Sequence, residues 1–194
     1  MPLPLRLMGV LVVCALLGLL SARSYPHVKQ TQKQQSDLRA KYLITSTDDF
    51  IVDVYQNGKH VPDSKRVMEN ETFGATVERI NIEVHKGDWI VFNVVNNRLR
   101  WGGAQYFGVA GCLTHNEFGF VSKAEDGNWS VCDSPSEVDA FISEAKRLRH
   151  RSVRRIDAPW DQGAARMKEH AGDRWDGDAI WGNSRNTWIK VNVE

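Results

Sequence analysis

Alternating apolar and polar residues between Thr76 and Val84 constrain the fold of this chain more than any other feature. Successive side chains of a β-strand point to opposite faces, so a period of two predicts a strand with one buried face. The expected buried face, after one irregularity, is Val77, Ile80, Ile82 and Val84. A turn at residues 86–88 then leads into residues 89–95 (WIVFNVV), whose almost continuous apolar character predicts a central strand.

Short strands and close turns are expected along the chain up to Leu113. Residues 50–55 alternate as a strand does, and Asn57-Gly58 behind them is the strongest short signal for a β-hairpin. Residues 42–45 and the glycine-containing stretch 104–113 predict further strands. Because the turns come at short intervals, we expect a mostly β protein, an antiparallel β-sandwich or jelly roll rather than a parallel α/β sheet.

The period becomes helical after residue 136. Apolar residues recur at three- and four-residue spacing up to Leu148, with Ser136 placed as the N-cap. A second short helix is expected at residues 161–170, so the helical insertion covers about residues 136–171 of a single domain at 40–194. Residues 114–133 are expected to form a loop, and residues 187–191 are expected to form a closing strand.

The N-terminus has the pattern of an export signal. An unbroken apolar run at residues 7–20 follows a basic start, and it is shorter than the roughly 20 residues that a transmembrane helix needs. Small residues at Ala22 and Ser24 predict cleavage after Ser24, so residues 1–24 are expected to be a signal peptide. A retained membrane anchor and lipidation at Cys14 are the alternatives.

Charge and composition describe what remains after cleavage. Residues 25–39 are polar and are expected to be a linker. The whole chain carries a net charge of +1, and loss of Arg6 and Arg23 leaves 23 basic residues against 24 acidic ones. That balance gives no reason to expect a nucleic-acid partner or membrane insertion after cleavage. The basic run at residues 146–151 either complements a helix dipole or contacts a heparin-like or phosphate-bearing partner.

Two cysteines, Cys112 and Cys132, remain after removal of residues 1–24. An even number of cysteines in a secreted, extracellular or periplasmic protein predicts a disulfide between them, worth about 3 kcal/mol by loop closure. The competing interpretation is a metal site that includes Cys112 and His115.

Four segments together resemble the galactose-binding-like jelly roll found beside extracellular glycosidases. They are TDDF at 47–50, VYQNG at 54–58, VHKGDW at 84–89 and VVNN at 94–97, followed by Gly102-Gly103. Asp88 stands where that family usually has Asn. The resemblance covers about residues 42–113 and the closing strand, and it implies a β-sandwich that binds carbohydrate without catalysis. Residues 114–186 have no counterpart, so the family's ligand-contacting loops are not transferred.

The same central segment is similar to a blue-copper protein. Residues 87–93 (GDWIVFN) match that pattern, and Cys112 and His115 have the spacing of two copper ligands. However, Phe120 stands at the axial position, and no histidine lies between Asn97 and Cys112 where another ligand is required. A copper site therefore lacks two of its ligands.

Tryptophans suggest a ligand surface. Exposed aromatic rings stack against the apolar face of sugar rings, while buried ones fill a core. Trp89 and Trp188, on expected strands, are predicted to be core residues. The candidate ligand-binding residues, which line either a surface groove or the core, are Arg98, Arg100, Trp101, Trp175 and Trp181.

No catalytic motif stands out. The histidines show neither a metalloprotease motif nor a nucleophile elbow, and no metal or cofactor is expected apart from the alternative of a weak structural calcium site at Asp173, Asp176 and Asp178. We therefore expect a secreted, non-catalytic module that binds carbohydrate or another cell-surface component. The alternative is a structural or adhesion domain that contacts other proteins. Less favoured alternatives are a copper protein and a glycosidase-type hydrolase with two carboxylates in one cleft.

Overall fold

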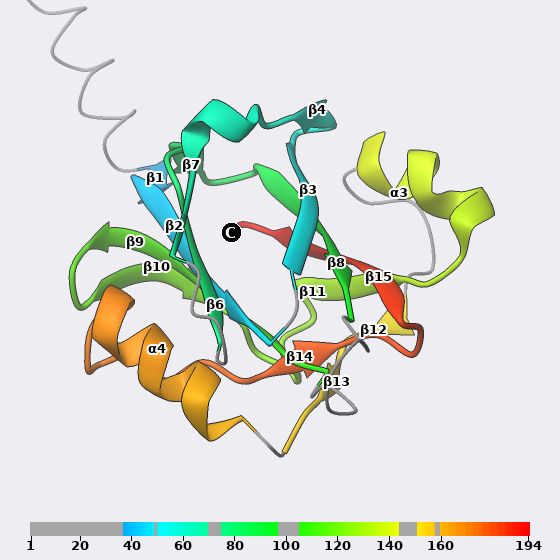
Figure 1. Ribbon diagram of the computed structural model, residues 1–194. Coiled ribbons are helices and arrows are strands. Elements are labelled where there is room, and N and C mark those ends of the chain that lie inside the picture. The colour runs from blue at the N-terminus through cyan, green and yellow to red at the C-terminus, as the bar shows by residue number, and fades with distance from the viewer. Residues whose placement is uncertain (1–36, 49, 70–74, 97–104, 144–150, 158–159) are drawn as a thin grey trace, which may run out of the picture. The chain divides into compact units, whose positions relative to one another are not determined.

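The structure is a computed structural model, and it describes residues 37–48, 50–69, 75–96, 105–143, 151–157 and 160–194. The elements below belong to one compact unit, Leu38–Glu194. Its described strands pair antiparallel in two large sheets (Figure 1). The predicted antiparallel β-sandwich, with helices near the C-terminal part, is confirmed.

The first sheet has seven strands. Its order is β13-β14-β9-β2-β6-β5, and β10 also pairs with β9. The strands are β2 (Tyr42–Thr47), β5 (Arg66–Glu69), β6 (Thr76–Ile80), β9 (Phe107–Thr114), β10 (Glu117–Val121), β13 (Arg154–Arg155) and β14 (Ile180–Trp181).

The second sheet has six strands in the order β12-β11-β15-β8-β3-β4. They are β3 (Phe50–Gln56), β4 (Lys59–His60), β8 (Trp89–Val95), β11 (Trp129–Cys132), β12 (Arg151–Ser152) and β15 (Asn186–Asn192). A small separate sheet pairs β1 (Leu38–Ala40) with β7 (Val84–His85). The fold therefore begins two residues before the predicted boundary at Ala40.

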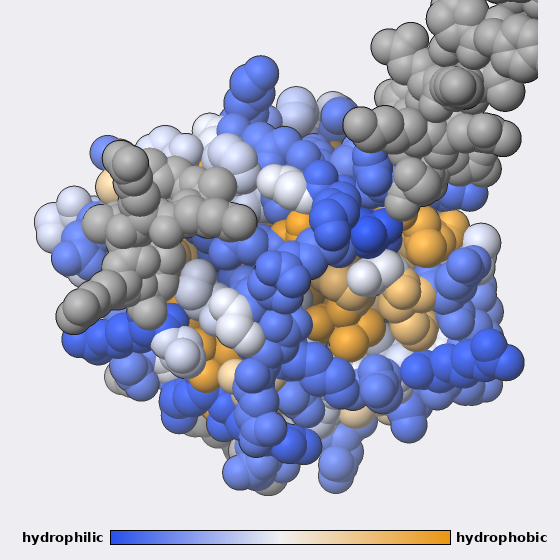
Figure 2. Space-filling view, turned by 180° about the vertical axis from the view of Figure 1, so that it is seen from behind, coloured by the Kyte–Doolittle hydropathy of each residue, from blue (hydrophilic) through white to orange (hydrophobic). Residues whose placement is uncertain are grey.

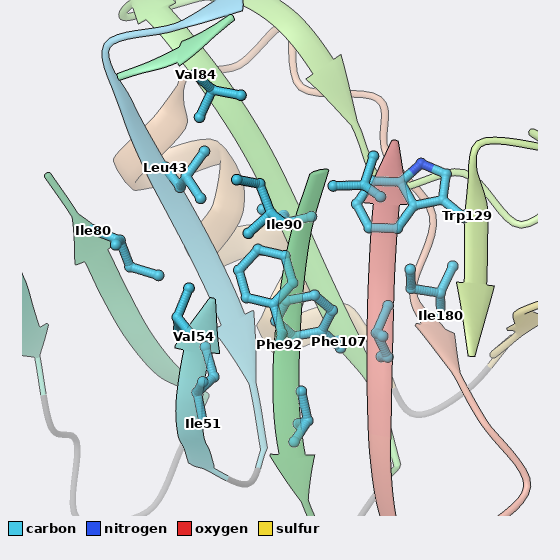
Figure 3. Close-up of a cluster of buried hydrophobic side chains, with 14 of the residues drawn as sticks. Leu43, Ile51, Val54, Ile80, Val84, Ile90, Phe92, Phe107, Trp129 and Ile180 are labelled. Atoms are coloured by element: carbon cyan, nitrogen blue, oxygen red, sulfur yellow. The ribbon is translucent and has the colours of Figure 1, made fainter. Parts of the chain in front are cut away.

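The main core fills the space between the two large sheets. Alternate residues of each central strand point inward, which is the arrangement that a period of two dictates. The rings of Phe92 on β8 and Phe107 on β9 meet across the sandwich with centroids 4.9 Å apart. Figure 3 shows both rings among aliphatic side chains from both sheets, including Leu43, Ile90 and Ile180.

One helix covers the outer face of each sheet (Figure 1). The helix α4 (Asp161–Ala171) packs Met167 against Ile44 of the first sheet. On the second sheet, α3 (Val138–Ser143) follows a 3-10 turn, η2 (Pro135–Glu137), and packs Phe141 against Val91. The predicted helix at 161–170 is confirmed within one residue. The predicted helix at 136–150 is described only to Ser143, because residues 144–150 lie outside the described part.

The segment 114–133 differs from its predicted loop character, because it contains strands β10 and β11. Its polar, glycine-containing sequence hid them, since β10 lies at the exposed margin of the first sheet and has no fully buried residue. The predicted closing strand is confirmed as β15, which pairs with both β8 and β11.

The predicted hairpin at Asn57-Gly58 is confirmed, with φ values of 52° and 76°. Both residues lie in the left-handed region that this tight turn requires. Asn57 Nδ2 donates to Asp88 Oδ1 (2.7 Å), and the amide of Trp89 donates to Asn57 Oδ1 (3.0 Å). Asp88 Oδ2 also accepts from the His85 amide (2.8 Å), so Asp88 fastens two turns to each other.

A buried ion pair joins the two sheets at their open edge. Arg66 of β5, which follows a 3-10 turn, η1 (Asp63–Lys65), donates from Nε to Glu78 Oε2 (2.7 Å) and from Nη2 to Glu78 Oε1 (2.8 Å). The same guanidinium reaches the other sheet, where Nη2 donates to Ile51 O (2.7 Å) and Nη1 to Val52 O (3.2 Å). The bond to Glu78 is the main cause that raises the pKa of Arg66.

The surface is mostly polar. Figure 2 shows one face covered largely by hydrophilic side chains, with apolar groups in view near its middle. The large apolar side chains that are exposed in the described structure are Phe50, Val52, Val67 and Met68. Within the described residues, no helix has the length and apolar character needed to cross a membrane.

Replacing Arg66 with Ala is expected to lower the free energy of unfolding by about 3 kcal/mol, because it leaves the Glu78 carboxylate buried without its counter-charge. Chemical denaturation measures the change. Lys65→Ala, which alters the exposed neighbouring residue, is the control. Equal stability of the two variants would show that the pair does not hold the sheets together.

Candidate functional site

The outer face of the second sheet carries an aromatic and polar surface beside α3. Strand register places Asp53, Asn93 and Trp188 in one row across β3, β8 and β15. The next row contains Phe50, Val95 and Asn186. Directly opposite residues share a face, with Cβ atoms about 5 Å apart. We call Phe50, Asp53, His60, Asn93 and Trp188 the platform.

A β-bulge decides which side chains reach the platform. Ile51 is opposite Val94 and Asp53 is opposite Asn93, so Val52 is an extra residue on β3. The extra residue lets Ile51 and Val54 both point into the core, while Phe50 and Asp53 both point outward. Phe50 is 43% exposed. The carbonyl groups of Ile51 and Val52, at the bulge, accept hydrogen bonds from Arg66.

Asp53 and His60 form the polar part of the platform. His60 Nε2 lies 3.0 Å from Asp53 Oδ1; the His60 side chain is exposed and the Asp53 side chain is partly exposed. Tyr55 lies beside them, with its ring edge-on to the imidazole at a centroid distance of 5.5 Å. Partial burial, together with the carboxylates of Asp53 and Asp139, raises the pKa of Tyr55. The site thus offers a carboxylate and an imidazole next to aromatic carbon.

Asn93 is a polar residue in the centre of this face. It is 8% exposed, and its Oδ1 has no hydrogen-bond partner in the described structure. An unpaired amide oxygen in a buried setting costs about 1–3 kcal/mol. An apolar residue at this position would avoid that cost, so the amide is not explained by stability.

The helix α3 forms one border of the platform. Trp89 Nε1 donates to Ile142 O (2.9 Å), and the buried Lys190 ammonium lies 4.2 Å from the centre of the Phe141 ring. Trp89 and Trp188 are half-buried against this helix rather than in the main core. The prediction that both are core residues is therefore wrong, because they are only partly covered, by α3, on the outer face of the second sheet.

The turn at residues 182–185 lies at the other border, directly before β15. Asp133 holds it, since its carboxylate accepts from the amides of Asn183 (3.0 Å) and Ser184 (3.2 Å) and from Thr187 Oγ1 (2.8 Å). A Cβ at Gly182 would collide with the same Asp133 and Thr187 side chains. The turn is therefore fixed by two half-buried hydrogen bonds and one exposed hydrogen bond to Asp133.

Two of the predicted ligand-binding tryptophans are buried. Trp175 is 3% exposed and packs under α4, while Trp181 is 0% exposed and belongs to the main core. Trp181 Nε1 donates to Ser184 O (3.0 Å), and Trp175 Nε1 lies 3.4 Å from Val109 O. Because both indole N–H groups have carbonyl partners, both rings serve packing. Both were candidate ligand-binding residues that could line either a groove or the core, and the structure places both in the core.

The other three predicted site residues, Arg98, Arg100 and Trp101, lie outside the described residues. The described residues on either side of them each accept a hydrogen bond from an arginine. Arg185 Nε donates to Asn96 O (2.9 Å), and Arg154 Nη2 donates to Gln105 Oε1 (2.7 Å).

The predicted disulfide is wrong, because Cys112 and Cys132 are both free and buried. Cys112 lies on β9 and packs outward against α4, whereas Cys132 lies on β11 and packs outward against α3. Two stacked sheets are about 10 Å apart, and a disulfide requires Cα atoms closer than about 7 Å. The two thiols therefore face opposite outer layers of the sandwich. Burial raises the pKa of Cys112 to about 11.

The described residues offer little support for the alternatives of a metal site or of two carboxylates in one cleft. The described residues contain no group of three His, Cys, Asp or Glu side chains placed to hold a metal ion. Asp178 accepts from the Ala124 amide (3.0 Å) and pairs with Arg155 (3.5 Å), and Asp176 pairs with Lys123 (3.5 Å). These carboxylates already have structural partners.

Comparisons with models of protein families, with curated proteins and with solved structures find no match for this chain. The interpretation of the platform therefore rests on the residues of this chain.

Both buried cysteines are expected to stay unreactive in the folded protein. In a Cys14→Ser chain, a thiolate-directed reagent should label fewer than one thiol per chain at pH 8 and two after denaturation, because the thiols are covered and the pKa of Cys112 is high. Mass spectrometry of the labelled protein counts them. An unlabelled denatured protein that gains two thiols on reduction would restore the disulfide.

Proposed function

We propose that this chain is a non-catalytic module that binds carbohydrate on the platform. The observation that carries the proposal is the exposed Phe50 ring in the row next to Asp53, Asn93 and Trp188. The apolar face of a sugar ring stacks on aromatic carbon, while its hydroxyl groups need hydrogen-bond donors and acceptors at the edge of that contact. The Asp53 carboxylate and the His60 imidazole are present at that edge.

Rigidity of the platform favours binding. Its residues stand on paired strands, and the bulge that exposes Phe50 is held by the Arg66 guanidinium. A surface that is already ordered loses little conformational entropy when a ligand binds.

Export and family are further parts of the proposal. The apolar segment at residues 7–20 supports secretion, and the resemblance of residues 42–113 to the galactose-binding-like jelly roll supports carbohydrate as the ligand class. Neither argument depends on the platform, so the three are independent.

A second candidate function is protein contact through the open edge of the sandwich. The edge strand β5 exposes Val67 (54%) and Met68 (51%), and an unpaired edge with apolar side chains can pair with another chain. Self-association that rises with concentration and disappears in Val67→Lys, together with a lack of glycan binding, would favour this function.

Phe50→Ala is expected to weaken glycan binding about tenfold, because it removes the exposed ring on which a sugar stacks. Val67→Ala, which removes a comparably exposed side chain from the other sheet, should bind as the unchanged chain does. A glycan array followed by calorimetry on the best ligand measures both. Binding that survives Phe50→Ala and Asp53→Ala together would place the ligand elsewhere and contradict the proposal.

Cleavage after Ser24 predicts that protein exported from a secretion-competent host begins at Tyr25. N-terminal sequencing of that protein measures the position. Recovery of the protein only inside cells, with Met1 present, would contradict export.

A further inference from the structure

Two arginines at the 182–185 turn have no carboxylate partner, and this inference about them deepens the proposed function. Arg154 and Arg185 are exposed, and neither forms an ion pair with a carboxylate in the described part of the chain. Arg154 Nε donates to Gly182 O (2.6 Å), and Arg185 Nε donates to Asn96 O (2.9 Å). Both contacts are to neutral oxygens, and the Asp133 carboxylate at this turn is bonded to the amides of Asn183 and Ser184 and to Thr187 rather than to either guanidinium.

Arg155 shows what a structural arginine looks like in the same segment. It lies 3.5 Å from Asp178 and 3.7 Å from Asp157. The chain as a whole carries a net charge of only +1. Exposed guanidinium groups without an ion-pair partner among the described residues therefore favour an anionic partner at this turn.

The turn and the platform are continuous along β15. Arg185 directly precedes Asn186, which lies opposite Val95, and Val95 lies opposite Phe50. Phe50 on β3 and Asn186 on β15 are two strand spacings apart, which is about 10 Å. An oligosaccharide lying across this row would have one ring at Phe50 and another beside Arg185, at the turn that Arg154 contacts through Gly182 O.

The arginines are also held in place before any ligand arrives. Asp133 fixes the turn between them through three hydrogen bonds, and the Trp181 indole donates to Ser184 O (3.0 Å). Arg154 already donates from Nε and Nη2, and Arg185 from Nε, so the remaining guanidinium N–H groups can bind a carboxylate or a sulfate with little loss of side-chain freedom.

We propose that the ligand is an acidic glycan, whose carboxylate or sulfate groups bind Arg154 and Arg185 while a neighbouring ring stacks on Phe50. The inference rests on the proposed function. The inference commits to a glycan because the exposed Phe50 ring offers aromatic carbon on which a sugar ring stacks, and nucleic acid is an outcome of the test.

The test compares three oligosaccharides of similar length, namely a heparin-derived one with sulfates, an oligogalacturonate with carboxylates and a neutral glucan. Calorimetry on the full chain is repeated with an Arg154→Gln/Arg185→Gln variant. Acidic ligands should bind at least tenfold more weakly to the variant, while the neutral ligand should change less than twofold. Added salt should weaken the binding of the acidic ligands and leave the binding of the neutral ligand unchanged.

Matched variants separate charge from folding. Arg154→Lys/Arg185→Lys keeps both charges and should retain most of the preference for acidic ligands, although it loses the paired geometry. Arg174→Gln removes an exposed arginine from the segment after α4 and should bind as the unchanged chain does. Thermal unfolding of every variant shows whether the turn is still folded.

The outcomes distinguish the two proposals. Equal binding of acidic and neutral glycans by the unchanged chain would overturn the acidic-ligand inference and leave the proposed function standing. Lack of binding to any glycan would overturn both. Single-stranded DNA of matched length is the last probe, and tighter binding to DNA than to the acidic glycans, lost in the Arg154→Gln/Arg185→Gln variant, would assign the arginines to nucleic acid and also overturn the inference.

Discussion

The geometry of the sandwich depends on one guanidinium. Arg66 binds the buried Glu78 carboxylate through two nitrogens and extends to the carbonyls of Ile51 and Val52 on the opposite sheet. Buried ion pairs are costly to desolvate and are kept where their hydrogen bonds are complete. Here the completed bonds stabilise a bulge, and the bulge turns Phe50 and Asp53 outward together. The hydrogen bonds of Arg66 thus determine which side chains of β3 are exposed.

Sequence periodicity located most strands but not the face that each residue occupies. Simple alternation from 50 to 55 would place Phe50 with Val52 and Val54 on one side of β3. The extra residue at Val52 breaks that alternation, so Val54 joins the core and Phe50 does not. A bulge has no reliable signal in a single sequence, because it depends on a partner strand and, here, on an arginine 14 residues further along. The platform was therefore not predicted, although Asp53 and Tyr55 have the two-residue spacing of side chains on one face of a strand.

The packing of helices on the two sheets explains why the predicted tryptophan ligands and the predicted disulfide were wrong. Trp175 and Trp181 were candidate ligand-binding residues, but each indole has a carbonyl partner that allows it to be buried. Counting cysteines predicted a bond between Cys112 and Cys132, yet the count says nothing about which side of a sheet each thiol faces. The helices at 138–143 and 161–171 create two separate outer layers, and each layer contains one cysteine.

The ends of the compact unit lie close together. The Arg39 Nε–H group donates to Glu194 O (2.7 Å), and Val193 pairs with Asp88 and Gly87. Between this place and the turn at 182–185 runs the whole of β15, which is about 23 Å for its seven residues. Coupling the protein to a bead or sensor chip through its last residue would therefore leave the arginines and Phe50 directed into solution.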